Sequence, residues 1–94
     1  MGELERLLKQ AFDEVTTSGN VIQVGVGLSR VVNMYLRGNN LALTLQKPGW
    51  VLVITGNMVQ AWDGHEKHRL EASLVISGVF IEGNRLYILL ELGH

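Results

Sequence analysis

The 94-residue chain contains no cysteine. This absence excludes disulfide bonds, cysteine-based zinc sites and thiol nucleophiles together. Charged residues are scarce, at 18% of the chain, and eight lysines and arginines against nine acidic residues leave a formal net charge of −1. The overall charge therefore does not point to a polyanionic partner. Low charge combined with 47% hydrophobic residues also excludes a disordered tail.

Long apolar runs are missing as well. No run approaches the roughly 20 residues that a membrane-spanning helix requires. The N-terminal segment mixes acidic and basic side chains among its leucines, whereas a secretory signal needs a basic start and an unbroken apolar stretch. A chain of this length suffices for one compact domain. We therefore predict a single domain over 1–94 that is cytoplasmic and has no membrane partner.

The first periodic feature is an apolar stripe with the 3.6-residue repeat of an α-helix. Its members are Leu4, Leu7, Leu8, Ala11, Phe12 and Val15. Acidic and basic residues occupy the opposite face. Gly19 suits the left-handed conformation that ends many helices. The pattern predicts a helix over about 3–17.

The rest of the chain is rich in β-branched, leucine and aromatic residues and shows no second helical pattern. Gly-Asn separates apolar runs at Gly38-Asn39, Gly56-Asn57 and Gly83-Asn84, and this dipeptide suits a two-residue type II′ hairpin turn. Asn39-Asn40 is an alternative centre for the first turn. The predicted strands cover about 21–28, 31–37, 40–46, 50–55, 58–62, 71–82 and 85–92, with a polar loop at 63–68.

Cross-strand pairing supports these hairpins. A two-residue turn at Gly83-Asn84 brings an opposite-charge pair and an aromatic pair together without adjustment. The predicted pairs are Glu82–Arg85, Phe80–Tyr87, Leu36–Leu41 and Ile54–Val59. The fold class that follows is α+β, with an N-terminal helix before a strongly curved antiparallel β-sheet meander or a small, partly open barrel over about 20–92.

Several predicted strands are apolar on both faces, notably at 51–54 and 86–90. One face of an antiparallel sheet normally meets water, so apolar and polar residues alternate along its strands. A single helix covers only a few strands on one side. The remaining apolar surface must close on itself or meet another subunit, and we predict a homo-oligomer, either a dimer or a small ring.

Candidate chemistry concentrates in the predicted polar loop. Asp63, His65 and His68 carry side chains that bind zinc or nickel. Their spacing differs from the metalloprotease motif, and the positive charges of Lys67 and Arg69 oppose a cation. We interpret the segment as a solvated loop and predict no metal or other cofactor. No serine lies in a Gly-x-Ser-x-Gly elbow and no acidic pair is spaced for acid–base work, so we predict a non-enzymatic protein without catalytic residues.

Basic residues are unevenly distributed along the chain. No acidic residue lies between Val15 and Trp62, while Arg30, Arg37 and Lys47 contribute three positive charges. Three charges are few for nucleic acid, whose binding depends on phosphate neutralisation, but a ring of subunits would repeat them. The alternative interpretation is that these are ordinary solvated side chains at exposed strand positions.

The last predicted hairpin, from Val79 to Ile88, joins two apolar strands through Glu82-Gly83-Asn84-Arg85. Together with the N-terminal helix before an all-strand segment, it resembles the Sm/LSm small-barrel family, whose second motif has Arg-Gly-Asn or Arg-Gly-Asp at this turn. Glu82 stands where that motif has arginine. Ala61-Trp62-Asp63 is similar to the first motif, although Lys67 replaces its asparagine. The resemblance implies subunits joined edge to edge in a ring, with RNA bases bound at the loops of the two motifs.

We predict a self-associating binding or assembly module for single-stranded RNA or DNA, because such sites combine backbone charge with base stacking on aromatic rings. The alternative is a small-molecule binding domain with an apolar pocket between helix and sheet or between subunits, and with His65 or His68 at its mouth. The predicted nucleic-acid-binding residues are Arg37, Asn39, Asn40, Asp63, His65, Asn84 and Arg85, with Trp50, Trp62 and Tyr87 as candidate stacking platforms.

Overall fold

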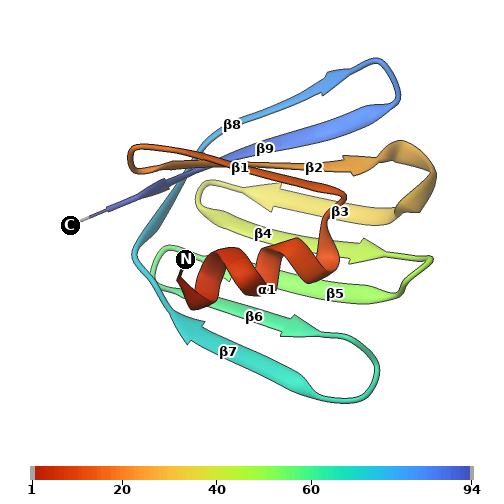
Figure 1. Cartoon of the computed structure of the whole chain (residues 1–94), viewed down its shortest axis with the longest axis horizontal. Coiled ribbons are helices and arrows are strands. Elements are labelled where there is room, and N and C mark those ends of the chain that lie inside the picture. Colours follow the sequence, from red (N-terminus) through yellow and green to blue (C-terminus); the bar gives the residue numbers. More distant parts are fainter. Residues whose placement is uncertain (1, 94) are drawn as a thin grey trace.

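The computed structural model describes residues 2–93, which form one α-helix, a 3₁₀ turn and nine strands in two antiparallel sheets (Figure 1). One sheet has the strand order β1-β2-β9-β8 and the other β3-β4-β5-β6-β7. The predicted α+β class with antiparallel strands is confirmed. The elements are α1 (Glu3–Ala11), β1 (Glu14–Ser18), β2 (Val21–Gly27), η1 (Leu28–Arg30), β3 (Val31–Arg37), β4 (Asn40–Leu45), β5 (Trp50–Thr55), β6 (Met58–Trp62), β7 (Lys67–Glu71), β8 (Leu74–Glu82) and β9 (Arg85–Leu92).

The prediction of a helix to residue 17 is wrong. α1 ends at Ala11, and the segment that follows forms β1, which pairs with β2. Val15 has the spacing of the helical stripe, but it is apolar because it packs against the core from β1, so its match to the helical period is a coincidence. Gly19, with φ of +60°, lies in the β1–β2 turn rather than at a helix end. No helix in the described part of the chain is long and apolar enough to cross a membrane.

The predicted hairpin registers are confirmed, since all four predicted cross-strand pairs occur. Gly38 and Gly83 have φ of +59° and +61°, and the asparagine after each has negative φ, which is the type II′ pattern. Gly56 is not left-handed, so its hairpin uses another turn type. Because Asn40 pairs with Arg37, the alternative turn shifted by one residue is excluded.

The strands belong to two sheets rather than to one curved meander or a partly open barrel. The predicted strand over 21–28 ends at Gly27, and η1 separates it from β3. β2 then pairs with β1 and β9, while β3 pairs with β4 alone. The 3₁₀ turn thus redirects the chain from one sheet to the other.

The predicted polar loop over 63–68 is wrong at its end, because Lys67 and His68 begin β7. The strand predicted over 71–82 begins only at Leu74. β7 pairs along its whole length with β6 and forms one edge of the five-stranded sheet. Its charged residues alternate with His68 and Leu70, which is the two-residue period of a half-buried strand.

The core lies between α1 and the inner faces of both sheets. In Figure 1, α1 runs across the five-stranded sheet. Alternate residues of β4 and β5 are buried beneath it, so only one face of that sheet joins the core. Each fully buried leucine or isoleucine stabilises the fold by roughly 1.5–3 kcal/mol. Core residues include Leu4, Leu7, Leu8, Ala11 and Phe12 from the helical end, Leu41, Leu43, Leu52 and Ile54 from one sheet, and Ile22, Val24, Ile88 and Leu90 from the other.

Arg30 connects the end of α1 and the segment that follows it to the β4–β5 turn. Its Nη1 donates to the backbone oxygen of Ala11 at 2.9 Å and to Oδ1 of Asp13 at 2.8 Å. Its Nε and Nη2 donate to the backbone oxygens of Gln46 and Pro48 at 2.9 and 3.0 Å. The side chain is only 12% exposed. The interpretation of Arg30 as an ordinary solvated arginine is therefore wrong.

Candidate nucleic-acid interface

The structure does not bring the seven predicted binding residues together. They lie at three separate hairpin ends: Arg37, Asn39 and Asn40 at the β3–β4 turn, Asp63 and His65 in the β6–β7 loop, and Asn84 and Arg85 at the β8–β9 turn. In Figure 1 the β3–β4 turn is at the left, whereas the other two lie at the lower and upper right. A single chain therefore presents no common surface built from these residues.

Some of these side chains already have structural partners. Arg85 Nη1 forms an ion pair with Glu14 Oε1 at 3.0 Å across the four-stranded sheet. Asn39 Oδ1 accepts the backbone N–H of Ile76 in β8 at 3.2 Å. Arg37 is different, since the described residues give it no hydrogen bond or ion pair and its side chain is exposed. Of the predicted basic residues, Arg37 is thus the one available to a ligand.

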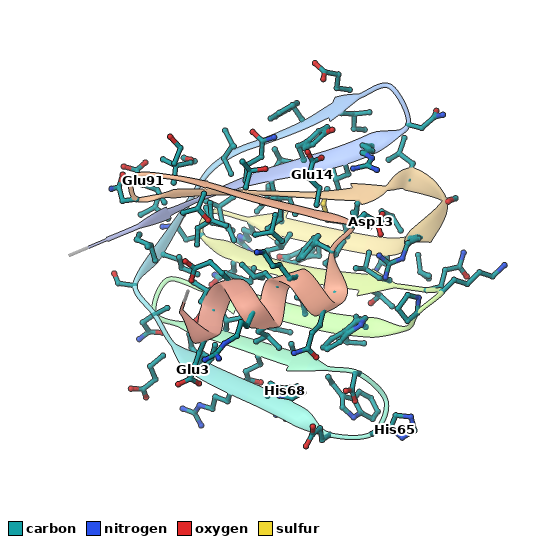
Figure 2. The ribbon with its side chains drawn as sticks, in the orientation of Figure 1. Glu3, Asp13, Glu14, His65, His68 and Glu91 are labelled. Atoms are coloured by element: carbon teal, nitrogen blue, oxygen red, sulfur yellow. The ribbon has the colours of Figure 1, made fainter. Side chains whose placement is uncertain are left out.

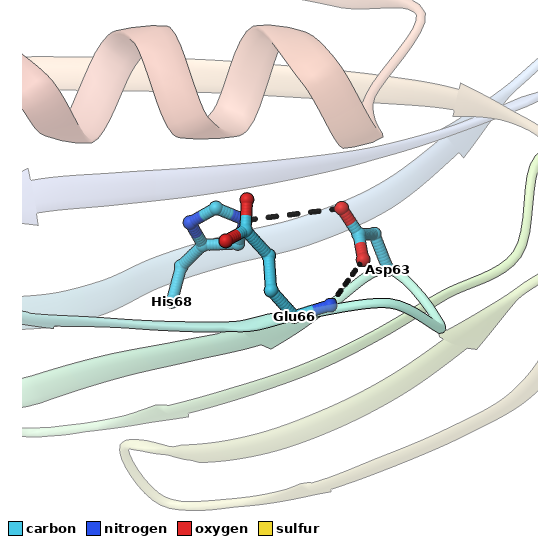
Figure 3. A group of neighbouring side chains, drawn as sticks. All are labelled: Asp63, Glu66 and His68. Carbon is cyan, nitrogen blue, oxygen red and sulfur yellow. Dashed lines mark hydrogen bonds and ion pairs between the residues drawn. The ribbon is translucent and has the colours of Figure 1, made fainter.

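Asp63 and Glu66 of the β6–β7 loop lie close to His68 at the start of β7 (Figure 3). Asp63 Oδ1 accepts the backbone N–H groups of His65 and Glu66 at 2.8 and 2.9 Å, and these bonds, that of Glu66 first, lower the pKa of Asp63. His68 Nε2 lies 3.8 Å from Asp63 Oδ2 and 3.7 Å from Glu66 Oε1. His65 lies farther out on the loop, apart from His68 (Figure 2).

This loop cluster holds the residues that could bind a divalent metal ion, with one ligand atom from each within 4.8 Å of the others. The sequence analysis considered Asp63, His65 and His68 as possible metal ligands, whereas in the structure Glu66 and not His65 lies with the other two. Lys67 and Arg69 pair with Trp62 and Gln60, so they belong to the opposite face of β7 from His68. The same geometry also serves an ion pair between a protonated imidazole and two carboxylates.

The outer face of the five-stranded sheet is uncovered. Strand register aligns Trp62 of β6 with Lys67 of β7 and Val51 of β5, and aligns Gln60 with Arg69 and Val53. Trp62 and Tyr35 are 51% and 54% exposed. We define the outer sheet face by Asn33, Tyr35, Arg37, Ala42, Thr44, Val51, Val53, Gln60, Trp62, Lys67 and Arg69.

Trp62 stands beside two hollows on this surface. One, of about 260 Å³, is lined by the side chains of Val51, Val53, Gln60 and Lys67 together with Trp62 itself. A second hollow of about 220 Å³ shares Trp62 and Val51 and extends to the β6–β7 loop. The indole therefore has open space next to it, with a cationic side chain directly opposite on the next strand.

The charge of the outer sheet face is positive. Arg37, Lys67 and Arg69 contribute three cations, and Glu71 at the end of β7 is the acidic residue in the same alternation. The sequence does not predict this arrangement, because the predicted polar loop over 63–68 includes the first two residues of β7 and no strand is predicted over 67–70. The signal that could have found it is the alternation of charged residues with His68 and Leu70, which places the charges on one face.

The chain matches no protein-family model, no curated protein sequence and no solved structure. The resemblance to the Sm/LSm family stays a prediction. The function must therefore be inferred from the geometry of the chain itself.

Proposed function

We propose that the protein is a non-enzymatic module that binds single-stranded nucleic acid on its outer sheet face. The observation that carries this proposal is the exposed indole of Trp62, which has a hollow beside it and Lys67 directly opposite. Stacking of one base on an aromatic side chain contributes about 1–3 kcal/mol, and neighbouring cations neutralise the phosphates. The outer sheet face supplies both kinds of group.

Each group has a distinct role in this proposal. Trp62 stacks on a base, and Lys67 and Arg69 neutralise phosphates. Gln60 lines the hollow and can hydrogen-bond a base edge. Tyr35 on β3 lies three strands from Trp62 on β6, which is about 14 Å at the usual strand spacing, and it offers a second stacking platform.

The number of cations sets the expected salt dependence. With Arg37, Lys67 and Arg69 engaged, the logarithm of affinity should fall against the logarithm of salt with a slope of about −2, at roughly 0.7 per phosphate for single strands. Affinity then falls about 20-fold between roughly 50 and 200 mM salt. A smaller slope means that fewer cations contact phosphate.

Fluorescence polarisation of labelled oligo-U and oligo-A tests the proposal at both salt concentrations. Trp62→Ala should weaken binding about 5- to 150-fold, as expected for the loss of one stacked base. Lys67→Gln should reduce the salt slope by about 0.7. Phe80→Ala is the matched control, because Phe80 is a 40%-exposed aromatic on the other sheet. No binding at low salt, or an equal loss in the Phe80 variant, would contradict the proposal.

One observation favours a small-molecule site as the second candidate. A hollow of about 290 Å³ lies between α1 and β7, with Glu3, Arg6 and Gln10 on one wall and His68 and Leu70 on the other. Its place between helix and sheet and its histidine support the small-molecule alternative, although its walls are mostly charged and polar rather than apolar. Binding of a ligand there should not be affected by Trp62→Ala.

A further inference from the structure

Four strands form the edges of the two sheets: β1, β8, β3 and β7. An edge strand exposes unpaired N–H and C=O groups, and proteins usually protect them with charges, bulges or covering segments. β7 carries three charged residues, and β1 carries threonines and a serine. The pairing of β8 with β9 is irregular between Ile76 and Gly78, and the backbone N–H of Ile76 donates a hydrogen bond to Asn39 Oδ1. β7 and β8 thus have such protection, and β1 is polar.

β3 has little such protection. All of its residues from 32 to 37 are exposed, and four of them are large and apolar. Their exposed fractions are 58% for Val32, 54% for Tyr35, 40% for Leu36 and 36% for Met34. The register with β4 is irregular only at Val32, so the segment 33–37 is a regular apolar edge.

The inner layer of the core stops one strand short of this edge. Met34 and Leu36 lie opposite Leu43 and Leu41, so they face the same side as the core. Leu43 and Leu41 are 0% and 1% exposed, whereas more than a third of Met34 and Leu36 remains accessible. An additional strand beside β3 would continue both the sheet and its apolar layer.

We propose that β3 pairs antiparallel with β3 of a second copy of the chain, about a two-fold axis at Tyr35. In this register Met34 of one copy lies opposite Leu36 of the other on the inner side. On the outer side Tyr35 lies opposite its equivalent, and Asn33 lies opposite Arg37. Cross-strand apolar and aromatic pairs of this kind stabilise a sheet.

The position of the single charge on β3 favours a second copy of the chain as the partner of this edge. Arg37 is the only charged residue of β3. In the antiparallel register the two Arg37 residues are four positions apart, about 14 Å along the strand, so like charges do not meet. The two-fold arrangement closes after two copies and forms one ten-stranded sheet with both outer sheet faces on the same side. Pairing does not depend on nucleic acid, so it is tested in its absence.

Disulfide trapping gives a direct test, because the chain has no cysteine of its own. Directly opposed antiparallel residues have Cα atoms about 4.5–5.5 Å apart, which fits a disulfide. Tyr35→Cys should therefore form a covalent dimer in a glutathione buffer. Val75→Cys on β8 and Arg69→Cys on β7 are the matched edge controls, and both should form little covalent dimer. Equal cross-linking of the Val75 variant, or none of the Tyr35 variant, would overturn the proposal.

Light scattering gives the independent measurement. The wild-type chain should have about twice its mass of 10.4 kDa at high micromolar concentration. Leu36→Lys, which places a charge on the inner side of β3, should shift the protein to a monomer with an unchanged circular dichroism spectrum. A wild-type monomer refutes the proposal. A mass that grows beyond the dimer with concentration also refutes it, and points to open-ended pairing of β3 with β8.

Discussion

Arg30→Ala should lower the free energy of unfolding by about 3 kcal/mol. The guanidinium makes four hydrogen bonds, to Ala11, Asp13, Gln46 and Pro48. At about 1.5 kcal/mol for each bond that involves a charged group, their sum is about 6 kcal/mol. Asp13 is 33% exposed, and the two carbonyls of the β4–β5 turn belong to exposed residues, so these acceptors regain water. We therefore halve the sum, because solvent screens such contacts.

The assay is thermal and urea unfolding followed by circular dichroism. A loss of about 3 kcal/mol lowers the Tm of a domain of this size by about 12–24 °C. Arg30→Lys keeps the charge but loses the planar fork, so it should fall between wild type and the alanine variant. Arg37→Ala is the matched control and should change stability by less than about 0.5 kcal/mol. If Arg30→Ala matches that control, the role assigned to Arg30 is wrong.

Two further predictions concern pH and close packing. Burial alone raises the pKa of Asp13, but the hydrogen bond from Gly27 N–H and the Arg30 guanidinium outweigh it and hold the pKa below its usual value. Asp13 thus adds stability above about pH 4 that is lost as the pH falls below it, and Asp13→Asn should flatten this acid dependence of Tm. Gly25→Ala should cost about 1–3 kcal/mol, because its Cβ would lie 2.8 Å from Tyr87 Cε1. Gly27→Ala, whose Cβ meets nothing nearer than 3.6 Å, is the control in the same unfolding assay.

The hairpins were predictable because each of them is specified by residues that are close together in the sequence. A two-residue turn fixes every pair in its hairpin, and Gly-Asn marks three of these turns directly. The boundary between α1 and β1 was not predictable from the apolar stripe, since Val15 satisfies both the helical period and the strand. A fourth dipeptide, Gly19-Asn20, was the missed signal, because it has the turn chemistry of the other three.

The candidate interface and the Arg30 contacts were less accessible to sequence reasoning. Arg30 binds acceptors 16 to 19 residues away, at the end of α1, in the segment that follows it and in the β4–β5 turn, and no sequence period relates Arg30 to them. The outer sheet face depends on which side of the sheet α1 covers, and that is set by tertiary packing. A pattern within one strand indicates that two faces exist, but it does not indicate which of them stays open.

The two strands with apolar residues on both faces show why the partner surface cannot be assigned from one strand alone. The outer side of β9 is covered within the chain, because Tyr87 packs over Gly25 and Leu89 packs over Gly78. Glycines on the neighbouring strands thus make room for large side chains. β5 has no glycine neighbours: Val51 lies between Thr44 and Trp62, Val53 lies between Ala42 and Gln60, and both valines remain 37% exposed. The partner surfaces that we propose therefore lie on the five-stranded sheet, at its outer face and at the edge formed by β3, and not on β9.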